Sequence, residues 1–247
     1  MNGREICPGV WHFEEDYRVY CTLLQGRDRA ILWDTGQGRR NLAAYVAQRV
    51  STPCLVLNSH GHSDHIGGNF RFPVVYAHRL DWPLLEAQAR MTGRGCAIEP
   101  LEVGEVFDLG GITGEVVSLA GHTRGSVGLL LEKERLLLAG DGLNPTLLLL
   151  GWEAAPVREL RQTLETAEKL PFDRYLSSHS PGPLGKKQVG LHLRHLDHLR
   201  VEPPSHPGPY GPRVCRSLYR EAGGRSVILF DRGLAEEGLL AIKERRT

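Results

Sequence analysis

Three histidines and an aspartate stand within six residues of one another, at His60, His62, Asp64 and His65. Neutral imidazole and carboxylate are the ligands that first-row divalent metals prefer where no thiolate is offered. Alternation between positions 60 and 62 can aim two side chains at one centre, and Asp64 and His65 can then hold a second ion nearby. A loop of hydrogen-bonded histidines is the simpler explanation for one such residue, but a cluster of this density favours a metal site.

Three further residues repeat this placement, because His122, Asp141 and His179 each follow an apolar run directly. Strand ends of a layered sheet converge on one edge, where α/β proteins place their sites. A lone histidine or a Gly-Asp pair at such a position is more often an ordinary loop or turn residue. Taken together, the five histidines and two aspartates are the number of ligands that two metals with open positions need.

The elements that must position these residues are short strands alternating with helices. Apolar runs closed by turns predict strands at 30–33, 54–57, 74–77, 115–119, 127–131, 135–139 and 174–177. Helical spacing predicts helices at 40–50, at 83–90 with Asp81 as N-cap, and from Pro156 to Ala167. Between His60 and His65 we expect a turn, because Gly61, Ser63 and Asp64 are poor helix formers. Strands mixed with helices indicate an α/β or α+β layered domain.

The chain changes character after His179. A helix is expected at 188–200, a Pro- and Gly-rich loop at 203–212, and a hairpin from strands 214–221 and 226–230. We interpret 1–247 as a single domain, with a metal-binding core at about 10–185 and an appendage at about 186–247. His192, His195 and His198 could bind metal at their spacing of three, but a solvated or pocket-capping helix is the favoured interpretation. Segments 90–100 and 203–212 are candidate lids.

Composition excludes several classes of partner. Lys and Arg total 30 against 29 Asp and Glu, which gives no electrostatic signature of a nucleic-acid or membrane-surface protein. Apolar runs are too short for a membrane helix, and charges interrupt the N-terminus, so we expect no signal peptide. The five scattered cysteines never form a CxxC pair, which predicts reduced thiols and a cytoplasmic location. The expected partner is a small-molecule substrate, with no nucleic acid and no membrane.

The ordered motifs resemble the metallo-β-lactamase superfamily of binuclear metallohydrolases. The resemblance rests on HxHxDH at 60–65, Gly121-His122-Thr123, Gly140-Asp141, Ser178-His179, and Asp34 as the early aspartate of that family. It runs from about residue 10 to 185. It implies a four-layer αββα sandwich with the metals at one edge, to which the C-terminal helix and hairpin would be appended.

The resemblance also implies roles for individual residues. By motif position, one metal would be held by His60, His62 and His122, the second by Asp64, His65 and His179, and Asp141 would bridge them. Two divalent ions are expected, with zinc favoured and iron or manganese as alternatives. Asp64 and Asp141 are the expected catalytic residues. Asp34, Thr123 and Ser126 are candidates for orienting the ligands. Asn144 and Arg124 are candidate substrate contacts, with a turn residue and a solvated cation as the alternatives.

The implied activity is a dinuclear metal-dependent hydrolase, in which a metal-bridging hydroxide cleaves a small-molecule ester, thioester or phosphoester. Asp141 argues against a true β-lactamase, since those enzymes lack this aspartate. His62 stands where flavodiiron proteins carry a glutamate, and Asn144 where lactone hydrolases often carry a tyrosine. The alternatives are a mononuclear iron dioxygenase resembling the persulfide dioxygenases, a lactonase, and a binding module that keeps its metals for structure.

Overall fold

The computed structural model describes residues 3–199, 214–222 and 224–231. Its first sheet has seven strands in chain order: β1 (Gly3–Cys7), β2 (Val10–Asp16), β3 (Val19–Gln25), β4 (Ala30–Trp33), β5 (Cys54–Leu57), β6 (Val74–Ala77) and β7 (Ala97–Pro100). Pairing is antiparallel from β1 to β4 and parallel from β4 to β7. Three α-helices and two 3-10 helices lie in its connections: α1 (Leu42–Ala47), α2 (Ser63–Ile66), η1 (Asn69–Arg71), η2 (Arg79–Asp81) and α3 (Trp82–Thr92).

The second sheet has six strands in the order β14-β13-β11-β10-β9-β8. Their bounds are β8 (Val106–Asp108), β9 (Thr113–Ser118), β10 (Val127–Leu131), β11 (Leu136–Gly140), β13 (Arg174–Ser177) and β14 (Leu184–Gly185). The crossover between the parallel strands β11 and β13 carries α4 (Val157–Ala167). A third sheet, ordered β12-β16-β15, joins β12 (Thr146–Leu149) to the C-terminal strands β15 (Val214–Glu221) and β16 (Gly224–Asp231).

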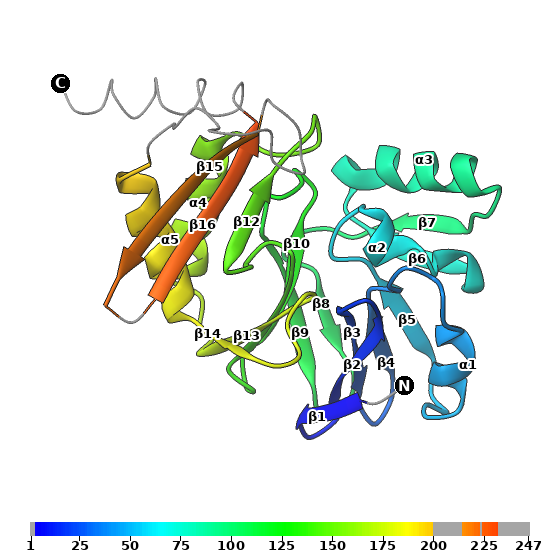
Figure 1. The fold of residues 1–247 in the computed structure, drawn as a ribbon. Helices are drawn as coiled ribbons and strands as arrows, with labels where there is room; N and C mark the ends of the chain where they lie inside the picture. Colours follow the sequence, from blue (N-terminus) through cyan, green and yellow to red (C-terminus); the bar gives the residue numbers. More distant parts are fainter. Residues whose placement is uncertain (1–2, 200–213, 223, 232–247) are drawn as a thin grey trace.

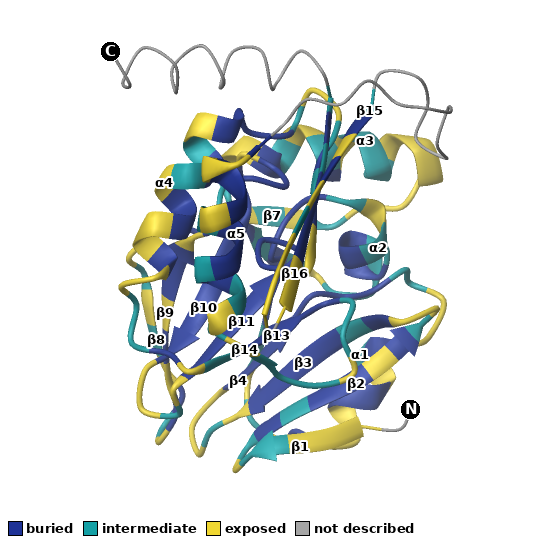
Figure 2. Cartoon of the chain, turned by 60° about the vertical axis from the view of Figure 1, so that its left-hand side comes forward, coloured by how far each residue is buried: buried dark blue, intermediate teal, exposed yellow. Residues whose placement is uncertain are grey.

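Alternation of side chains along the strands builds the four layers. In β4, Ile31 and Trp33 enter the core between the two large sheets, whereas Leu32 packs with residues of α1 and α3. In β11, Leu138 faces the inter-sheet core and Leu137 faces α4. Figure 1 shows α1 and α3 on one outer side and α4 with α5 (Lys187–Asp197) on the other, and Figure 2 shows the strands between them as mostly buried. The αββα sandwich that the sequence predicts is therefore confirmed.

Most of the predicted elements are present, some with the predicted bounds and others with shifted ends. The strands at 30–33, 54–57, 74–77, 127–131 and 174–177 have the predicted bounds. Strands β1 to β3, β7, β8, β12 and β14 are additional, and of the helix expected at 40–50 only α1 is present. The turn predicted between His60 and His65 is wrong, because Ser63 begins the single helical turn α2. The amides of His65 and Ile66 both donate to the His62 carbonyl, at 2.9 and 3.1 Å, and burial of Ile66 outweighs the weak helix propensity.

The C-terminal elements share a core with the second sheet. Leu147 and Leu149 of β12 pack with Ile228 and Phe230 of β16 in the same apolar cluster as α4 and α5. The hairpin therefore extends the sandwich through β12, which is paired in parallel with β16. The boundary near 186 stays a prediction, and the candidate lid at 203–212 lies outside the described residues. In the described part of the chain, no helix has the length and apolar character needed to cross a membrane.

Candidate metal centre

All seven predicted ligands meet at one edge of the sandwich. Residues 60–65 follow β5, His122 lies in the β9–β10 loop, Asp141 follows β11 and His179 follows β13. Their ligand atoms form three overlapping groups, within each of which all atoms lie within 4.8 Å of one another. The groups are His60, His62 and His122; His60, His65 and Asp141; and Asp64, His65 and His179. The first and third are the two sets that the resemblance implies.

Asp141 lies between these two sets. Its Oδ2 is 3.1 Å from His179 Nε2 and 3.7 Å from His122 Nε2, and its Oδ1 is 3.8 Å from His65 Nε2. Asp64 Oδ2 lies 3.5 Å from His65 Nε2 and 3.6 Å from His179 Nε2. A carboxylate that faces ligands of both sets can bridge two cations.

Asp34 fixes the orientation of two of the histidines. It is fully buried, and Ser59 donates to it through both its amide and its hydroxyl, each at 2.7 Å. The Ser59 oxygen is thereby free to accept from His60 Nδ1 at 3.0 Å, and Asp34 Oδ2 accepts from His65 Nδ1 at 3.0 Å. Both rings therefore carry their proton on Nδ1 and present the Nε2 lone pair to the centre.

His122 and His62 are oriented by other partners. His122 Nδ1 donates to the Leu148 carbonyl at 2.7 Å, which leaves a lone pair on Nε2. His62 Nε2 lies 3.2 Å from Glu153 Oε1, which leaves a lone pair on Nδ1. These two lone-pair nitrogens face each other at 2.8 Å. Two lone pairs at that separation require a cation or an extra proton between them.

Unpaired buried atoms provide a test of whether the site fits metal ions. His60 Nε2, His65 Nε2 and Asp141 Oδ1 are buried and have no hydrogen-bond partner among the described residues. Leaving a buried polar atom unpaired costs about 1–3 kcal/mol, and native structures contain few such atoms. All three belong to the ligand groups, so cations bound there would satisfy each of them. The donor set, all nitrogen and oxygen, fits a pair of divalent metals.

The electrostatics of the site favour the ligating protonation states of Asp141, Asp64 and His60. Burial raises the pKa of Asp141, but the imidazoles of His65, His179 and His122 outweigh it and hold that pKa well below its usual range. Burial likewise opposes the effect of His65 on Asp64, whose pKa falls to about 2. Burial and the neighbouring histidines lower the pKa of His60 well below its usual range. Two carboxylates and a neutral imidazole are the forms that bind metals. Burial lowers the pKa of His65 and of His179, but neighbouring carboxylates, above all Asp141, outweigh it and raise both pKa values, so metal binding at these two rings would release protons.

Asp81 holds the two ligand-bearing loops together, a role that the sequence analysis missed. The predicted N-cap position is right, but the carboxylate makes no capping hydrogen bond to α3. It accepts instead from the Gly61 amide at 2.8 Å, the Gly125 amide at 3.0 Å and the Thr123 hydroxyl at 2.7 Å. A Cβ at Gly125 would lie 2.4 Å from Asp81 Oδ1, so the close contact depends on glycine. No local pattern marks an aspartate that acts on loops so distant in sequence.

A cavity of about 420 Å³ opens beside the centre, between the edge of the two large sheets and the third sheet. Asp141 and His179 line it, and so does Asn144, which the sequence analysis predicts as a substrate contact. The remaining wall is largely apolar, from residues that include Pro145, Leu148, Pro181, Leu184 and Leu229. Arg124, the other predicted contact, is exposed and does not line this cavity. Arg18 does line it and was missed.

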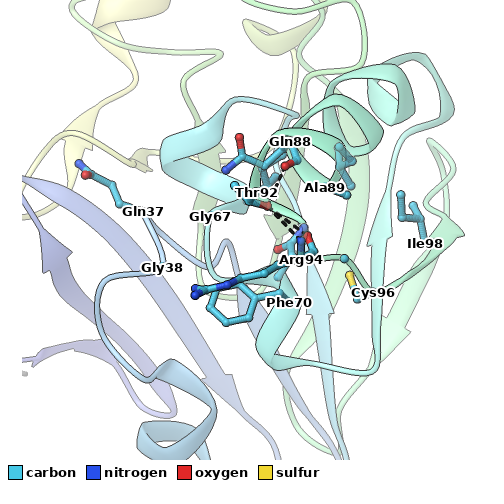
Figure 3. A pocket seen from close by; sticks show the side chains of 14 residues that line it. Gln37, Gly38, Gly67, Phe70, Gln88, Ala89, Thr92, Arg94, Cys96 and Ile98 are labelled. Carbon is cyan, nitrogen blue, oxygen red and sulfur yellow. Dashed lines mark hydrogen bonds between the residues drawn. The ribbon is translucent and has the colours of Figure 1, made fainter.

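A second cavity, of about 370 Å³, lies between the α2–η1 segment and the α3–β7 segment (Figure 3). Its side chains include Phe70 and Arg94, whose guanidinium carbon lies 4.9 Å from the ring centroid. None of the seven candidate ligands lines it. The segment 90–100, predicted as a lid, borders this second cavity as the end of α3 and as β7, and it does not line the cavity at the centre.

The histidines of α5 lie away from the ligand groups. His192 and His195 are buried, so a solvated helix face is the wrong interpretation for them, whereas His198 is exposed. His192 Nε2 donates to the Asn144 carbonyl at 2.9 Å, and Nδ1 lies 2.7 Å from the Ser226 hydroxyl. These contacts fix α5 to β16 and to the wall of the first cavity.

Comparisons with known proteins agree with this arrangement. The family model for the metallo-beta-lactamase superfamily matches residues 15–179. The chain is 32% identical over 149 residues to an atrochrysone carboxyl ACP thioesterase of Emericella nidulans, a match that covers 59% of this chain and 44% of that protein. It is 26% identical over 166 residues to the acyl-coenzyme A thioesterase MBLAC2 of Bos taurus, covering 52% and 60%.

The structural comparison supports the fold independently. A metallo-beta-lactamase family protein from Thermus thermophilus superposes with a TM-score of 0.62 at 21% identity, over 78% of this chain and 81% of that one. The chain spans about half the length of the curated relatives it matches. The family match covers more than half of the chain and includes all seven candidate ligands. This protein therefore belongs to the metallo-beta-lactamase superfamily.

Proposed function

We propose that the protein is a dinuclear metal-dependent hydrolase of small-molecule acyl thioesters, with zinc as the favoured metal. The observation that carries the proposal is a set of buried candidate ligand atoms without hydrogen-bond partners among the described residues: His60 Nε2, His65 Nε2 and Asp141 Oδ1. Hydrogen bonds elsewhere on each histidine ring already fix its orientation, so the site is preorganised for cations. The thioester is favoured because both curated relatives described above are named thioesterases.

Metals in these groups would supply a nucleophile from water at neutral pH and polarise the scissile carbonyl. The chain's own contribution is placement. Asp64 and Asp141 are held as carboxylates, and Asp34 fixes the rings of His60 and His65. The apolar wall that includes Leu148 and Leu229 excludes water from one side of the substrate and contacts its acyl portion.

A cysteine nucleophile is not supported by the described thiols. Burial raises the pKa of Cys7, Cys21, Cys54 and Cys96, so these four groups are protonated at neutral pH. None of the five cysteines lines the cavity beside the centre. Hydrolysis by this site is therefore proposed to use water, without a covalent acyl-enzyme.

The test combines metal analysis with a thioesterase assay on the purified chain. We expect two metals per chain and turnover of S-acyl-N-acetylcysteamine substrates that is lost in Asp141→Asn. His198→Gln is the matched control, because His198 is exposed and outside the ligand groups. A single iron per chain with oxygen uptake on sulfur substrates would contradict the proposal and favour the dioxygenase alternative. Two retained metals without turnover on any ester, thioester, lactone or phosphoester would contradict it in favour of a binding module.

A further inference from the structure

We propose that Arg18 binds an anionic group of the substrate, so that the hydrolase selects acyl thioesters carrying a carboxylate or phosphate beyond the scissile bond. This inference rests on the proposed function for the reaction, but the binding of an anion by Arg18 can be tested separately. Arg18 lines the same cavity as the candidate ligands Asp141 and His179.

The backbone holds Arg18 at the tip of a tight hairpin. Asp16 and Val19 are paired across β2 and β3, so Tyr17 and Arg18 alone form the turn. Both have positive φ, of 46° and 60°, a conformation for which such turns usually employ Asn and Gly. Strained non-glycine residues of this kind concentrate at ligand-binding positions. The turn keeps two large side chains where small ones would be less strained.

Contacts behind the tip fix the hairpin against the loop that carries His179. The Tyr20 amide donates to the Ser178 carbonyl at 2.8 Å, and His12 Nε2 lies 2.9 Å from the Ser180 carbonyl. These bonds lie on either side of His179 in sequence. The position of Arg18 relative to the centre is therefore set by direct hydrogen bonds between the two segments.

The two side chains of the turn have different surroundings. Tyr17 packs against Arg39, whose guanidinium carbon lies 4.7 Å from the ring centroid, and Arg39 is itself 3.4 Å from Asp16 Oδ2. Arg18 makes no ion pair with any carboxylate among the described residues, and the nearby Glu14 carboxylate accepts from the Arg18 amide at 2.8 Å instead. The Arg18 guanidinium therefore lies beside the cavity and has no carboxylate partner among the described residues.

Charge and polarity indicate what that guanidinium would bind. Arg18 is the sole Lys or Arg among the described residues that line the cavity, and much of the rest of the wall is apolar. Arg18 is exposed to solvent, and a planar guanidinium binds carboxylate or phosphate through two parallel hydrogen bonds. The substrate class is therefore an acyl thioester with an apolar stretch and an anion, located on either the acyl half or the thiol half.

The experiment compares three thioesters in the metal-loaded enzyme. S-pentanoyl-N-acetylcysteamine is neutral, S-glutaryl-N-acetylcysteamine carries a carboxylate on the acyl half, and S-pentanoyl-3-mercaptopropionate carries one on the thiol half. We expect Arg18→Ala to raise KM for one of the charged substrates by about 10-fold or more, as expected for loss of a charge-assisted hydrogen bond. The neutral substrate should change by less than about twofold, and Arg18→Lys should recover part of the loss. The charged substrate that responds identifies the half that carries the anion.

Arg27→Ala is the matched control, because Arg27 is exposed on the β3–β4 turn and paired with Asp28 at 3.1 Å. Equal effects of Arg18→Ala on all three substrates, or no effect on any, would overturn the proposal. A second measurement separates this failure from failure of the proposed function. If no thioester is hydrolysed, calorimetric titration of glutarate against pentanoate, and of 3-mercaptopropionate against the neutral thiol N-acetylcysteamine, decides the role of Arg18. We expect wild type to prefer the probe with the additional carboxylate in one of the two pairs and Arg18→Ala to lose that preference, and an unchanged preference would overturn the inference.

Discussion

Two groups of histidines in this protein differ in how their ring nitrogens are satisfied. The rim histidines are His60, His62, His65, His122 and His179, and the α5 histidines are His192 and His195. In the α5 pair, every ring nitrogen contacts a hydroxyl or a carbonyl. His195 Nε2 lies 2.8 Å from the Ser217 hydroxyl, and its Nδ1 lies 2.6 Å from the Ser226 hydroxyl.

The α5 contacts form one directed chain of hydrogen bonds. The Asn144 carbonyl can only accept, so His192 donates from Nε2 and must accept from Ser226 at Nδ1. Ser226 then accepts from His195 Nδ1, and Ser217 donates to His195 Nε2. Each proton is used once, and neutral side chains complete the network. Among the rim histidines, by contrast, His60 Nε2 and His65 Nε2 have no partner in the part of the chain that the structure describes.

The difference teaches that spacing alone does not distinguish a metal ligand from a structural histidine. His192 and His195 have a helical spacing that can bind metal, yet neighbouring hydroxyls and a carbonyl satisfy them completely. His60, His62, His65 and His122 each have one ring nitrogen held by a protein group, and the other nitrogen faces the centre. This second arrangement suits a cation, whereas the α5 network leaves no nitrogen lone pair for one.

The largest expected effect comes from exchanging one histidine of each group for glutamine. His60→Gln should lower the metal content below two per chain and reduce thioesterase activity to background, because His60 belongs to two ligand groups. His195→Gln should keep both metals but lower the free energy of unfolding, since it interrupts a buried network. Elemental analysis and urea denaturation measure the two outcomes. Loss of metal in His195→Gln would contradict the distinction between structural α5 histidines and metal-binding rim histidines.

Asp81→Asn should affect both stability and metal binding. Its buried carboxylate accepts from three donors in two ligand-bearing loops, and asparagine keeps only one accepting oxygen, so at least one donor would face the amide NH2 group. We expect a loss of about 3–4 kcal/mol in the free energy of unfolding. Metal affinity should fall by about 10- to 100-fold, as for other groups that orient ligands. Asp108→Asn, an exposed change, is the control, and equal effects from both variants would contradict the role of Asp81.

The α5 histidines also predict a pH dependence of stability in the metal-free protein. Burial lowers the pKa of His192 and of His195 from 6.5 to about 4. The unfolded chain therefore binds protons between pH 6.5 and 4 that the folded chain does not, and stability falls as the pH decreases through that window. For His192 the loss approaches about 3 kcal/mol. Urea titrations of wild type and His192→Gln should diverge above pH 6.5 and converge toward pH 4, and parallel curves would refute the assignment.

Glu153→Gln should have the smallest effect. The glutamine oxygen can still accept from His62 Nε2, now 3.2 Å from Glu153 Oε1, so folding should be unchanged. Loss of the negative charge makes His62 a weaker ligand, and we expect metal affinity to fall by about 10-fold. Competition with a chromophoric chelator measures this. If metal affinity is unchanged in Glu153→Gln, Glu153 only orients the His62 ring, and its charge does not make His62 a stronger ligand.

The sequence predicts which candidate ligands come together because they have a common local signal. Each one follows a strand or stands in one dense motif, and all seven meet at one edge. The contacts of Asp81 and Glu153 were missed because their partners are distant in the chain, and Arg18 was missed because the cavity it lines is built from segments distant in the chain. β2 was missed partly because it contains Glu15, a charged residue that is fully buried and accepts from the amides of Gln37 and Arg40 at 3.0 and 2.7 Å. Tertiary contacts, which no local pattern encodes, decide these positions.

Anomalous diffraction at the metal absorption edges tests the central claim most directly. The account predicts two peaks per chain, one about 2.0–2.3 Å from His60 Nε2, His62 Nδ1 and His122 Nε2, and one at similar distances from Asp64, His65 Nε2 and His179 Nε2. Asp141 should contact both. A single peak, or a peak beside His192 and His195 in place of the rim, would contradict a dinuclear centre built from these seven side chains.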